Sequence, residues 1–283
     1  MPLSGVGEHL LLLISKRDQN TEWIAGLLAK LAGIQRQDVG FCGLKDRYAV
    51  TTQWFSLYLP GRDIEIDSLF HDDFEIIESS RHLKKLRRGM HTGNRFRIEL
   101  RDFSVSNDQL SERINAISDM GVPNYFGEQR FGRNANNLSE VQKLVELDKL
   151  KGNKRGTGLY LSAARSWLFN LILAEHINRK SMTNFDLDQE TGALWGRGRS
   201  GANFGIAKLE EGVLNDWKDW CYALEHSGLR QQRRNLIVRP SQLSFEKIAE
   251  RNWRFKFSLP KGSFATAILR EIAELSRLTE HRL

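Results

Sequence analysis

Alternation of apolar and polar residues predicts strands near both ends of the chain. Two runs show the period of two that is typical of a half-buried strand. Their apolar positions are Phe55, Leu57 and Leu59 in the first run, and Trp253, Phe255, Phe257 and Leu259 in the second. Shorter versions of the pattern predict strands at 74–76 and 96–100. The unbroken apolar run 10–14 predicts a buried strand.

Apolar residues spaced three and four apart predict helices, most of them in the middle of the chain. The strongest helix is expected over 161–177, where Ala164, Leu168, Leu171 and Ile172 share one side. Five residues are expected to mark helix ends: Thr21, Ser106 (in a capping box with Gln109) and Ser263 as N-caps, and Gly33 and Gly121 as C-terminal stops.

This order of elements, with strands at both ends and helices between, predicts an α+β domain interrupted by an insertion. A length of 283 residues allows one large domain or two ordinary ones. The sequence shows no internal repeat and no low-complexity tract.

The charge balance points to a polyanionic partner. The formal net charge is +7 and the isoelectric point is about 9.5. A basic surface attracts nucleic acid through counterion release. A membrane is the weaker alternative, because the early apolar run 10–14 is far shorter than the ~20 residues of a spanning helix. No basic and apolar leader opens the chain, so we predict a cytoplasmic protein that binds no membrane.

Nothing in the sequence indicates a metal or cofactor. Cys42 and Cys221 are far apart and have no metal-type spacing, so they are interpreted as reduced thiols. No zinc motif, phosphate-binding glycine loop or dinucleotide fingerprint occurs. We therefore predict no metal and no cofactor, and we expect a monomer.

The segment Gly43–Gln53 places Asp46 between Lys45 and Arg47, in a turn before the strand that contains Phe55. A free aspartate has a pKa of about 3.9 and is anionic at neutral pH, and flanking cations favour that charged form. This suits a nucleophile better than a general acid. The alternative interpretation is a local ion pair and Asx turn, which is common for such a sequence.

The densest basic stretch runs from Arg81 to Arg97 and contains no acidic residue. It holds the cations Arg81, Lys84, Lys85, Arg87, Arg88, Arg95 and Arg97. Because these charges would repel one another, a bound polyanion is the favoured interpretation, and a solvated loop is the alternative.

Asn94 and Phe96 stand at the end of this stretch, where a strand is expected to begin. An Asn can bind the edge of a base, and a Phe can stack on a base extruded from a helix. On spacing alone, a turn Asn and a core Phe are the simpler interpretation. The aromatic and glycine-rich segment 124–132 either lines a site or fills a corner of the fold. The cations Arg230, Arg233, Arg234 and Arg239 form a second basic group or a solvated face.

Taken together, these segments resemble the TruD family of tRNA pseudouridine synthases. The similarity includes Gly43–Gln53 and Gly93–Phe96, and it extends from about Gly7 to the C-terminus in the order typical of the family. Further matching blocks are 122–127, 129–132, 161–166, 194–198, 242–244 and 259–266.

The resemblance implies a pseudouridine-synthase catalytic domain with a mixed, mostly antiparallel sheet. This domain would comprise residues 1–120 and 239–283 and be interrupted by a TruD-specific α/β insertion at 121–238. The resemblance also implies isomerisation of a uridine of tRNA, at position 13 in this family, without a cofactor. Asp46 matches the nucleophile of the family, and Asn94 and Phe96 match its substrate-contacting residues.

Further contacts are predicted from position and charge. Lys45 and Arg47 are expected to bind the substrate beside Asp46. The cations Lys84, Lys85, Arg87 and Arg88 are expected to bind RNA phosphates. Asp46 would attack C1′ of the ribose or C6 of uracil, or remove a ribose proton, and the sequence does not choose among these.

Two departures from the family pattern lead to a second hypothesis. An N-terminal Phe-x-Val-x-Glu strand, with an aromatic that reaches the active site, is expected before Gly7 and is missing from the sequence. The insertion also looks short between Ser181 and Thr191. The second hypothesis is therefore a truncated tRNA-binding homologue with impaired catalysis. A third, a basic interaction module, leaves the Gly43–Gln53 segment unexplained.

Overall fold

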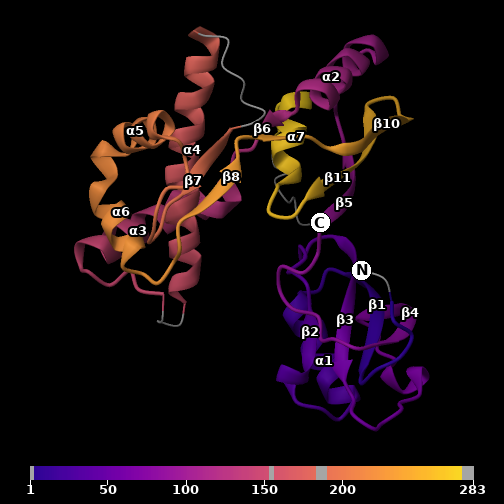
Figure 1. Ribbon diagram of the computed structural model, residues 1–283. Coiled ribbons are helices and arrows are strands. Elements are labelled where there is room, and N and C mark those ends of the chain that lie inside the picture. Colours follow the sequence, from indigo (N-terminus) through magenta and orange to yellow (C-terminus); the bar gives the residue numbers. More distant parts are fainter. Residues whose placement is uncertain (1–2, 153–155, 183–189, 276–283) are drawn as a thin grey trace. The chain divides into compact units, whose positions relative to one another are not determined.

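The computed structural model describes residues 3–152, 156–182 and 190–275. The chain divides after Thr92 into two units, residues 1–92 and 93–283, and each is described here by itself (Figure 1).

The first unit is a four-stranded antiparallel sheet with one helix packed on it. The strand order is β2 (Val39–Phe41), β3 (Val50–Tyr58), β1 (His9–Arg17) and β4 (Phe74–His82). The helix α1 (Thr21–Leu31) buries Ile24, Ala25 and Leu28 against the even-numbered apolar residues of β1 and the odd-numbered ones of β3. Two short 3₁₀ helices, η1 (Arg36–Asp38) and η2 (Ile66–Leu69), join these elements.

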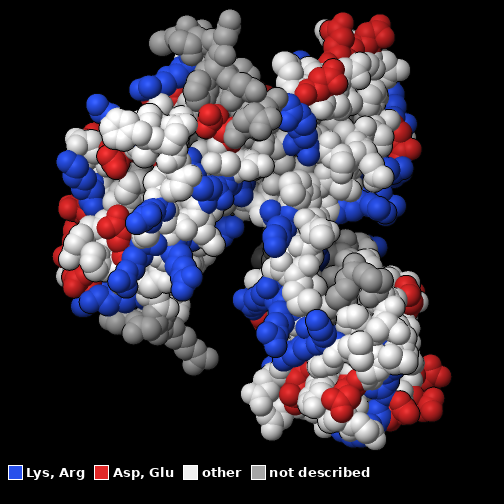
Figure 2. Space-filling view, viewed as in Figure 1, with Lys and Arg blue, Asp and Glu red and all other residues white. Residues whose placement is uncertain are grey.

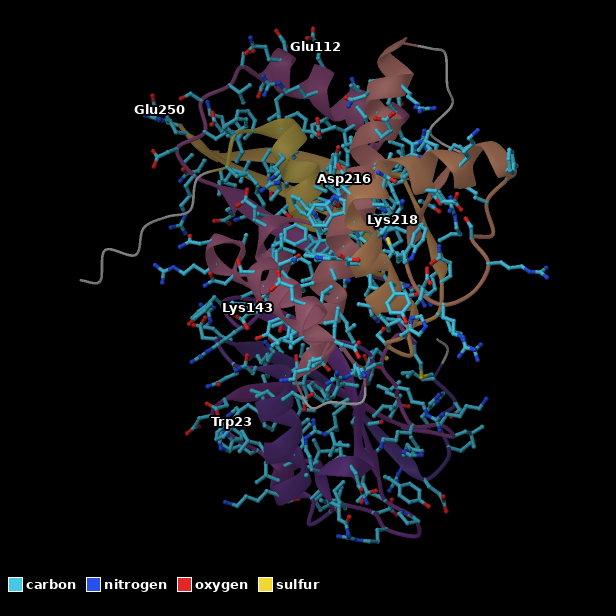
Figure 3. All side chains as sticks on the ribbon, turned by 90° about the vertical axis from the view of Figure 1, so that its left-hand side faces the viewer. Trp23, Glu112, Lys143, Asp216, Lys218 and Glu250 are labelled. Atoms are coloured by element: carbon cyan, nitrogen blue, oxygen red, sulfur yellow. The ribbon has the colours of Figure 1, made fainter. Side chains whose placement is uncertain are left out.

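The second unit begins with a three-stranded antiparallel sheet in the order β10 (Ser241–Ala249), β11 (Asn252–Pro260) and β5 (Gly93–Leu100). The helices α2 (Asn107–Met120) and α7 (Ala265–Ile272) share one apolar cluster with Trp253, Phe255 and Phe257 of β11. Glu250 lies in the turn between β10 and β11, and its side chain points into solvent (Figure 3). The alternation predicted at both ends of the chain is thus confirmed.

The remainder of this unit is built around the long helix α4 (Thr157–Met182), which has fully buried residues at Ala164, Leu168 and Ile172. Around it lie α3 (Asn136–Glu146), α5 (Phe204–Val213), α6 (Lys218–Glu225) and the antiparallel pair of β7 (Thr191–Leu194) and β8 (Gln232–Asn235). A second short pair joins β6 (Val122–Pro123) to β9 (Ile237–Val238). The 3₁₀ helices here are η3 (Glu128–Phe131), η4 (Arg133–Ala135) and η5 (Asn215–Trp217).

The predicted helix ends have mixed outcomes. The Ser106 hydroxyl accepts a hydrogen bond from the Gln109 N–H at 3.2 Å, which confirms that cap, and Gly121 ends α2 with φ of 71°. Two expectations were wrong. The N-cap of α1 is Asn20, and Thr21 is the first helical residue. The N-cap of α7 is Phe264, because Ser263 belongs to the preceding turn, where its N–H donates to Pro260.

These two serines provide a matched stability test. Ser106→Ala removes the partner of an N-terminal N–H and should destabilise the protein by about 1 kcal/mol. Ser263→Ala removes no capping bond and should change stability by less than about 0.5 kcal/mol. Urea unfolding of both variants measures the difference. Equal effects would contradict the assignment of Ser106 as a cap.

Membrane-spanning helices and metal sites can be sought only among the described residues. Within the described ranges, no helix is long and apolar enough to cross a membrane, and no group of three or more His, Cys, Asp or Glu residues is arranged to hold a metal ion. Cys42 and Cys221 are free thiols. The expected shortening between Ser181 and Thr191 falls largely on residues 183–189, outside the described ranges.

Candidate active site

Asp46 lies in the loop that joins β2 to β3. The loop begins where the apolar residues of β2 end at Phe41, and it returns to the sheet at Val50. Phe41 and Phe55 are register partners, so the two strands fix both ends of the loop. The Asp46 side chain is exposed. A carboxylate that must reach a substrate needs such access.

The backbone of this loop is held from two sides. The Thr21 hydroxyl accepts a hydrogen bond from the Lys45 N–H at 3.0 Å and one from the Gln53 side-chain amide at 3.3 Å. The Lys16 ammonium donates to the Asp46 carbonyl oxygen at 2.9 Å. Thr21 therefore anchors the loop instead of capping α1, which gives the reason for the wrong prediction.

Lys16 is a buried cation, with only 2% of its surface exposed. It continues the inward-facing positions Leu10, Leu12 and Ile14 of β1. Burial lowers the pKa of Lys16, and the carboxylates of Asp46 and Asp18 act in the opposite direction. The sequence prediction missed this residue. The signal in the sequence is the spacing of Lys16, which stands two residues after Ile14, on the face of the strand where buried apolar residues are expected.

The two cations that flank Asp46 have different environments. Lys45 is half-buried, and burial lowers its pKa while the Asp46 charge raises it. Arg47 is exposed, with its Nε 3.4 Å from the Asp18 carbonyl oxygen and its guanidinium carbon 5.4 Å from the centre of the Tyr48 ring. The carboxylate of Asp46 thus interacts with the Lys16 and Lys45 ammonium groups. Binding of substrate by Lys45 and Arg47 stays a prediction.

The basic segment packs against the same loop. The Gly89 N–H donates to the Cys42 carbonyl oxygen at 2.8 Å, and the His91 Nδ1 lies 3.1 Å from that oxygen. A Cβ atom on Gly43 would lie 3.2 Å from the His91 ring, so the glycine permits the close approach. The Leu86 N–H donates to the buried Ser56 hydroxyl at 3.0 Å. These contacts attach the segment to β2, β3 and the Asp46 loop.

Three of the four residues that are predicted to contact phosphates, Lys85, Arg87 and Arg88, line one groove of about 730 Å³. Arg36, Phe41 and Glu22 also line this groove. Lys84 is exposed and does not line it. Lys and Arg side chains gather on the β2 side of this unit (Figure 2). The guanidinium carbons of Arg36 and Arg88 lie 5.6 and 5.5 Å from the centre of the Phe41 ring.

Two cations of the basic segment have acidic partners, contrary to the expectation that this segment lacks counterions. The segment Arg81–Arg97 contains no acid, but other segments supply counterions. Arg81 forms an ion pair with Asp63, and Arg88 forms one with Glu22, which also pairs with Arg36. Because Arg81 and Arg88 have counterions, repulsion among the cations of this segment is only a weak reason to expect a bound polyanion. These exposed pairs contribute little and leave the groove cationic.

Asn94 and Phe96 lie on β5, in the second unit. Asn94 is the register partner of Leu259, so it belongs to a strand and not to a turn. Phe96 is half-buried and stacks on Phe257 with ring centres 5.5 Å apart. It packs against the apolar cluster of this sheet, which agrees with its interpretation as a core residue. Because Asp46 belongs to the other unit, its cooperation with Asn94 and Phe96 stays a prediction.

Comparisons with known proteins place this geometry in a family. The family model described as "tRNA pseudouridine synthase D (TruD)" matches residues 3–155 and 208–272, which include Asp46, Asn94 and Phe96. The chain therefore belongs to the TruD family. Two family blocks quoted from the sequence, 161–166 and 194–198, lie outside the matched ranges.

Individual members of the TruD family are similar over nearly the whole chain. A curated tRNA pseudouridine synthase D from Cellvibrio japonicus is 40% identical over 282 residues, covering 96% of this chain and 84% of the relative. The corresponding protein from Aeromonas salmonicida is 39% identical, with 95% and 85% covered. A crystal structure of a TruD protein from Methanosarcina mazei superposes with a TM-score of 0.67 at 18% identity, covering 96% and 89%. The α+β fold with antiparallel sheets is thus confirmed.

Proposed function

We propose that this chain is a tRNA pseudouridine synthase, an isomerase that converts a uridine of tRNA to pseudouridine with Asp46 as its catalytic carboxylate. The observation that carries the proposal is the TruD family match across the Asp46 loop. The relatives cited above bear the name of that activity. The second hypothesis, impaired catalysis, finds no support in these comparisons.

The reaction needs a carboxylate that is accessible and fixed. In the isomerisation the N1–C1′ bond breaks, the uracil turns, and C5 joins C1′ as the C5 hydrogen leaves for solvent and N1 gains a proton. The exposed Asp46 side chain is available for this work, and its backbone is held by Thr21 and Lys16. Burial lowers the pKa of both Lys16 and Lys45, and the Asp46 charge opposes that effect. Attack on C1′, attack on C6 and removal of a ribose proton all use this same group.

The base must leave its helix before reaction. Extrusion costs a few kcal/mol, which stacking and polar contacts offset. On the family pattern we assign these contacts to Phe96 and Asn94; the half-buried Phe96 ring packs on Phe257 and still has exposed surface for a base. We assign the guidance of phosphates to Lys84, Lys85, Arg87 and Arg88. The groove that three of these cations line supports the second assignment.

The finer features of the proposal follow the family pattern. The target is uridine 13, and residues 121–238 form the insertion within a catalytic domain of residues 1–120 and 239–283. The pairing of Val122 with Val238 supports these limits, because it brings the two ends of the insertion together. Free thiols at Cys42 and Cys221 support a cytoplasmic site of action.

Release of tritium from 5-labelled uridine in a tRNA transcript tests the proposal directly, because C5 loses its hydrogen when it joins C1′. The chain should release tritium from a transcript that carries uridine at position 13. A matched transcript with cytidine at that position should release none. Binding of tRNA without any release would instead favour the second hypothesis.

A further inference from the structure

A second cationic cavity lies wholly within residues 93–283, and none of its lining residues has a role in the function proposed above. Its volume is about 730 Å³. Its lining includes residues of α4, Leu194 of β7 and Arg234 of β8, and these three elements are labelled in Figure 1. Three arginines line it: Arg130 of η3, Arg165 of α4 and Arg234 of β8. We name it the three-arginine cavity.

The three guanidinium groups have neutral partners. Arg130 donates to the Ser162 hydroxyl at 2.9 Å, and Arg165 donates to the carbonyl oxygens of Leu194 and Arg230 at 2.7 and 2.9 Å. Arg234 donates to the Gly262 carbonyl oxygen at 2.7 Å and to Asn124. No acidic residue is among those that line the cavity in the described part of the chain.

Each arginine also has one N–H that is shielded from solvent and lacks an acceptor within the described ranges. The Nε atoms of Arg130, Arg165 and Arg234 are buried and have no hydrogen-bond partner among the described residues. A buried N–H without an acceptor is costly, and three of them around one cavity are unusual.

The electrostatics of the cavity also favour an anionic ligand. Burial lowers the pKa of Arg130 and of Arg165. Burial and the Arg130 charge lower the pKa of Arg234 to about 10. The Phe126 ring lies 4.2 Å from the Arg234 guanidinium carbon and compensates part of the charge. A ring carries no net charge, so three gathered cations still favour an anion.

The remaining lining completes a site of nucleotide size. Ser162 precedes Arg165 by three residues on α4 and Ser166 by four, so the Ser162 hydroxyl lies on the helix face of both, and all three residues line the cavity. Phe126, Leu161, Leu194 and Leu229 add apolar surface. The volume falls in the range of small-ligand pockets, roughly 300–1,000 Å³.

We propose that the three-arginine cavity binds one nucleotide of RNA through its phosphate group. Arginine forks match phosphate oxygens in geometry and charge, and serine hydroxyls add neutral donors. The inference rests on the proposed function, since the nucleotide belongs to the tRNA substrate. A free phosphate shares the same chemistry and is the alternative source.

The test measures tRNA binding by the full chain across a range of salt concentrations. Each phosphate contact contributes about one unit to the slope of the logarithm of the association constant against the logarithm of the salt concentration. Arg130→Gln should reduce the slope by about one and weaken binding roughly tenfold. Arg130→Lys keeps the charge and should retain the slope. Arg251→Gln, which changes an exposed arginine beside Asp102, is the matched control and should alter neither quantity.

A measurement on the unmodified chain avoids the risk that Arg130→Gln does not fold. Phenylglyoxal modifies arginines, and mass spectrometry locates the product. Bound tRNA should slow modification of Arg130 and leave that of Arg251 unchanged. Protection by inorganic phosphate but not by tRNA would assign the cavity to free phosphate and overturn the RNA assignment. Equal modification with and without tRNA, or an unchanged slope in a folded Arg130→Gln, would also overturn it.

The outcome is separable from that of the proposed function. Tritium release by the same preparation, together with an unchanged slope, would reject the cavity alone. A reduced slope without tritium release would reject the catalytic proposal and retain the cavity.

Discussion

Replacement of Asp46 by Asn is expected to abolish pseudouridine formation and to leave tRNA binding almost unchanged. The amide has nearly the same size as the carboxylate but lacks the negative charge that attacks carbon or accepts a proton. Removal of a catalytic group of this kind lowers kcat by roughly 10⁴-fold or more. Affinity for tRNA should stay within about twofold, because phosphate contacts dominate binding. Tritium release and a binding titration on the same variant measure the two quantities.

Asp18→Asn is the matched control. Asp18 is also an exposed acid whose charge acts on Lys16. It has a left-handed backbone conformation, with φ of 55°, which Asn tolerates. This variant should retain near-normal turnover. Comparable turnover by Asp46→Asn, or an equal loss in Asp18→Asn, would remove Asp46 from its proposed role.

Much of the fold could be predicted from the sequence because its signals are local. The alternation in Trp253–Leu259 depends only on one strand with a buried face, and β11 has that form. The capping box at Ser106 is also local, and the structure contains the predicted bond. Ser263 has the right residue type but stands one position before the N-cap, because a turn from Pro260 comes first. A tight turn can shift the start of a helix by one residue, and the helix propensities of the residues do not indicate that shift.

The candidate site was less predictable because its parts meet through tertiary contacts. Arg88 and its partner Glu22 are 66 residues apart in sequence, so the basic segment looked free of counterions. The sequence predicts a helix cap at Thr21, but the Thr21 hydroxyl accepts a hydrogen bond from the Lys45 N–H, 24 residues away. The prediction that Asp46 is the catalytic acid rests on its motif and on the resemblance to a family. Neither periodicity nor composition would have selected it from the other acidic residues.

Lys16 offers the sharpest test of how the fold serves the site. Lys16→Met is expected to lower kcat about 100-fold, because the Asp46 carbonyl loses its ammonium donor and a shift of about 1 Å in a catalytic group has an effect of that size. The KM for tRNA should change by no more than about twofold, since Lys16 is buried and away from solvent. Tritium-release kinetics at several tRNA concentrations separate kcat from KM.

The stability of this variant distinguishes positioning from simple packing. A buried cation is expensive, and an apolar side chain of similar length often leaves stability unchanged or higher. Urea unfolding of Lys16→Met should therefore show no loss while kcat falls. Arg17→Met, at the adjacent exposed position of β1, should change neither quantity. If Lys16→Met unfolded readily or kept its full kcat, the buried ammonium would have no positioning role. A stable and slow variant would show that the protein retains a costly buried charge in order to fix the backbone of Asp46.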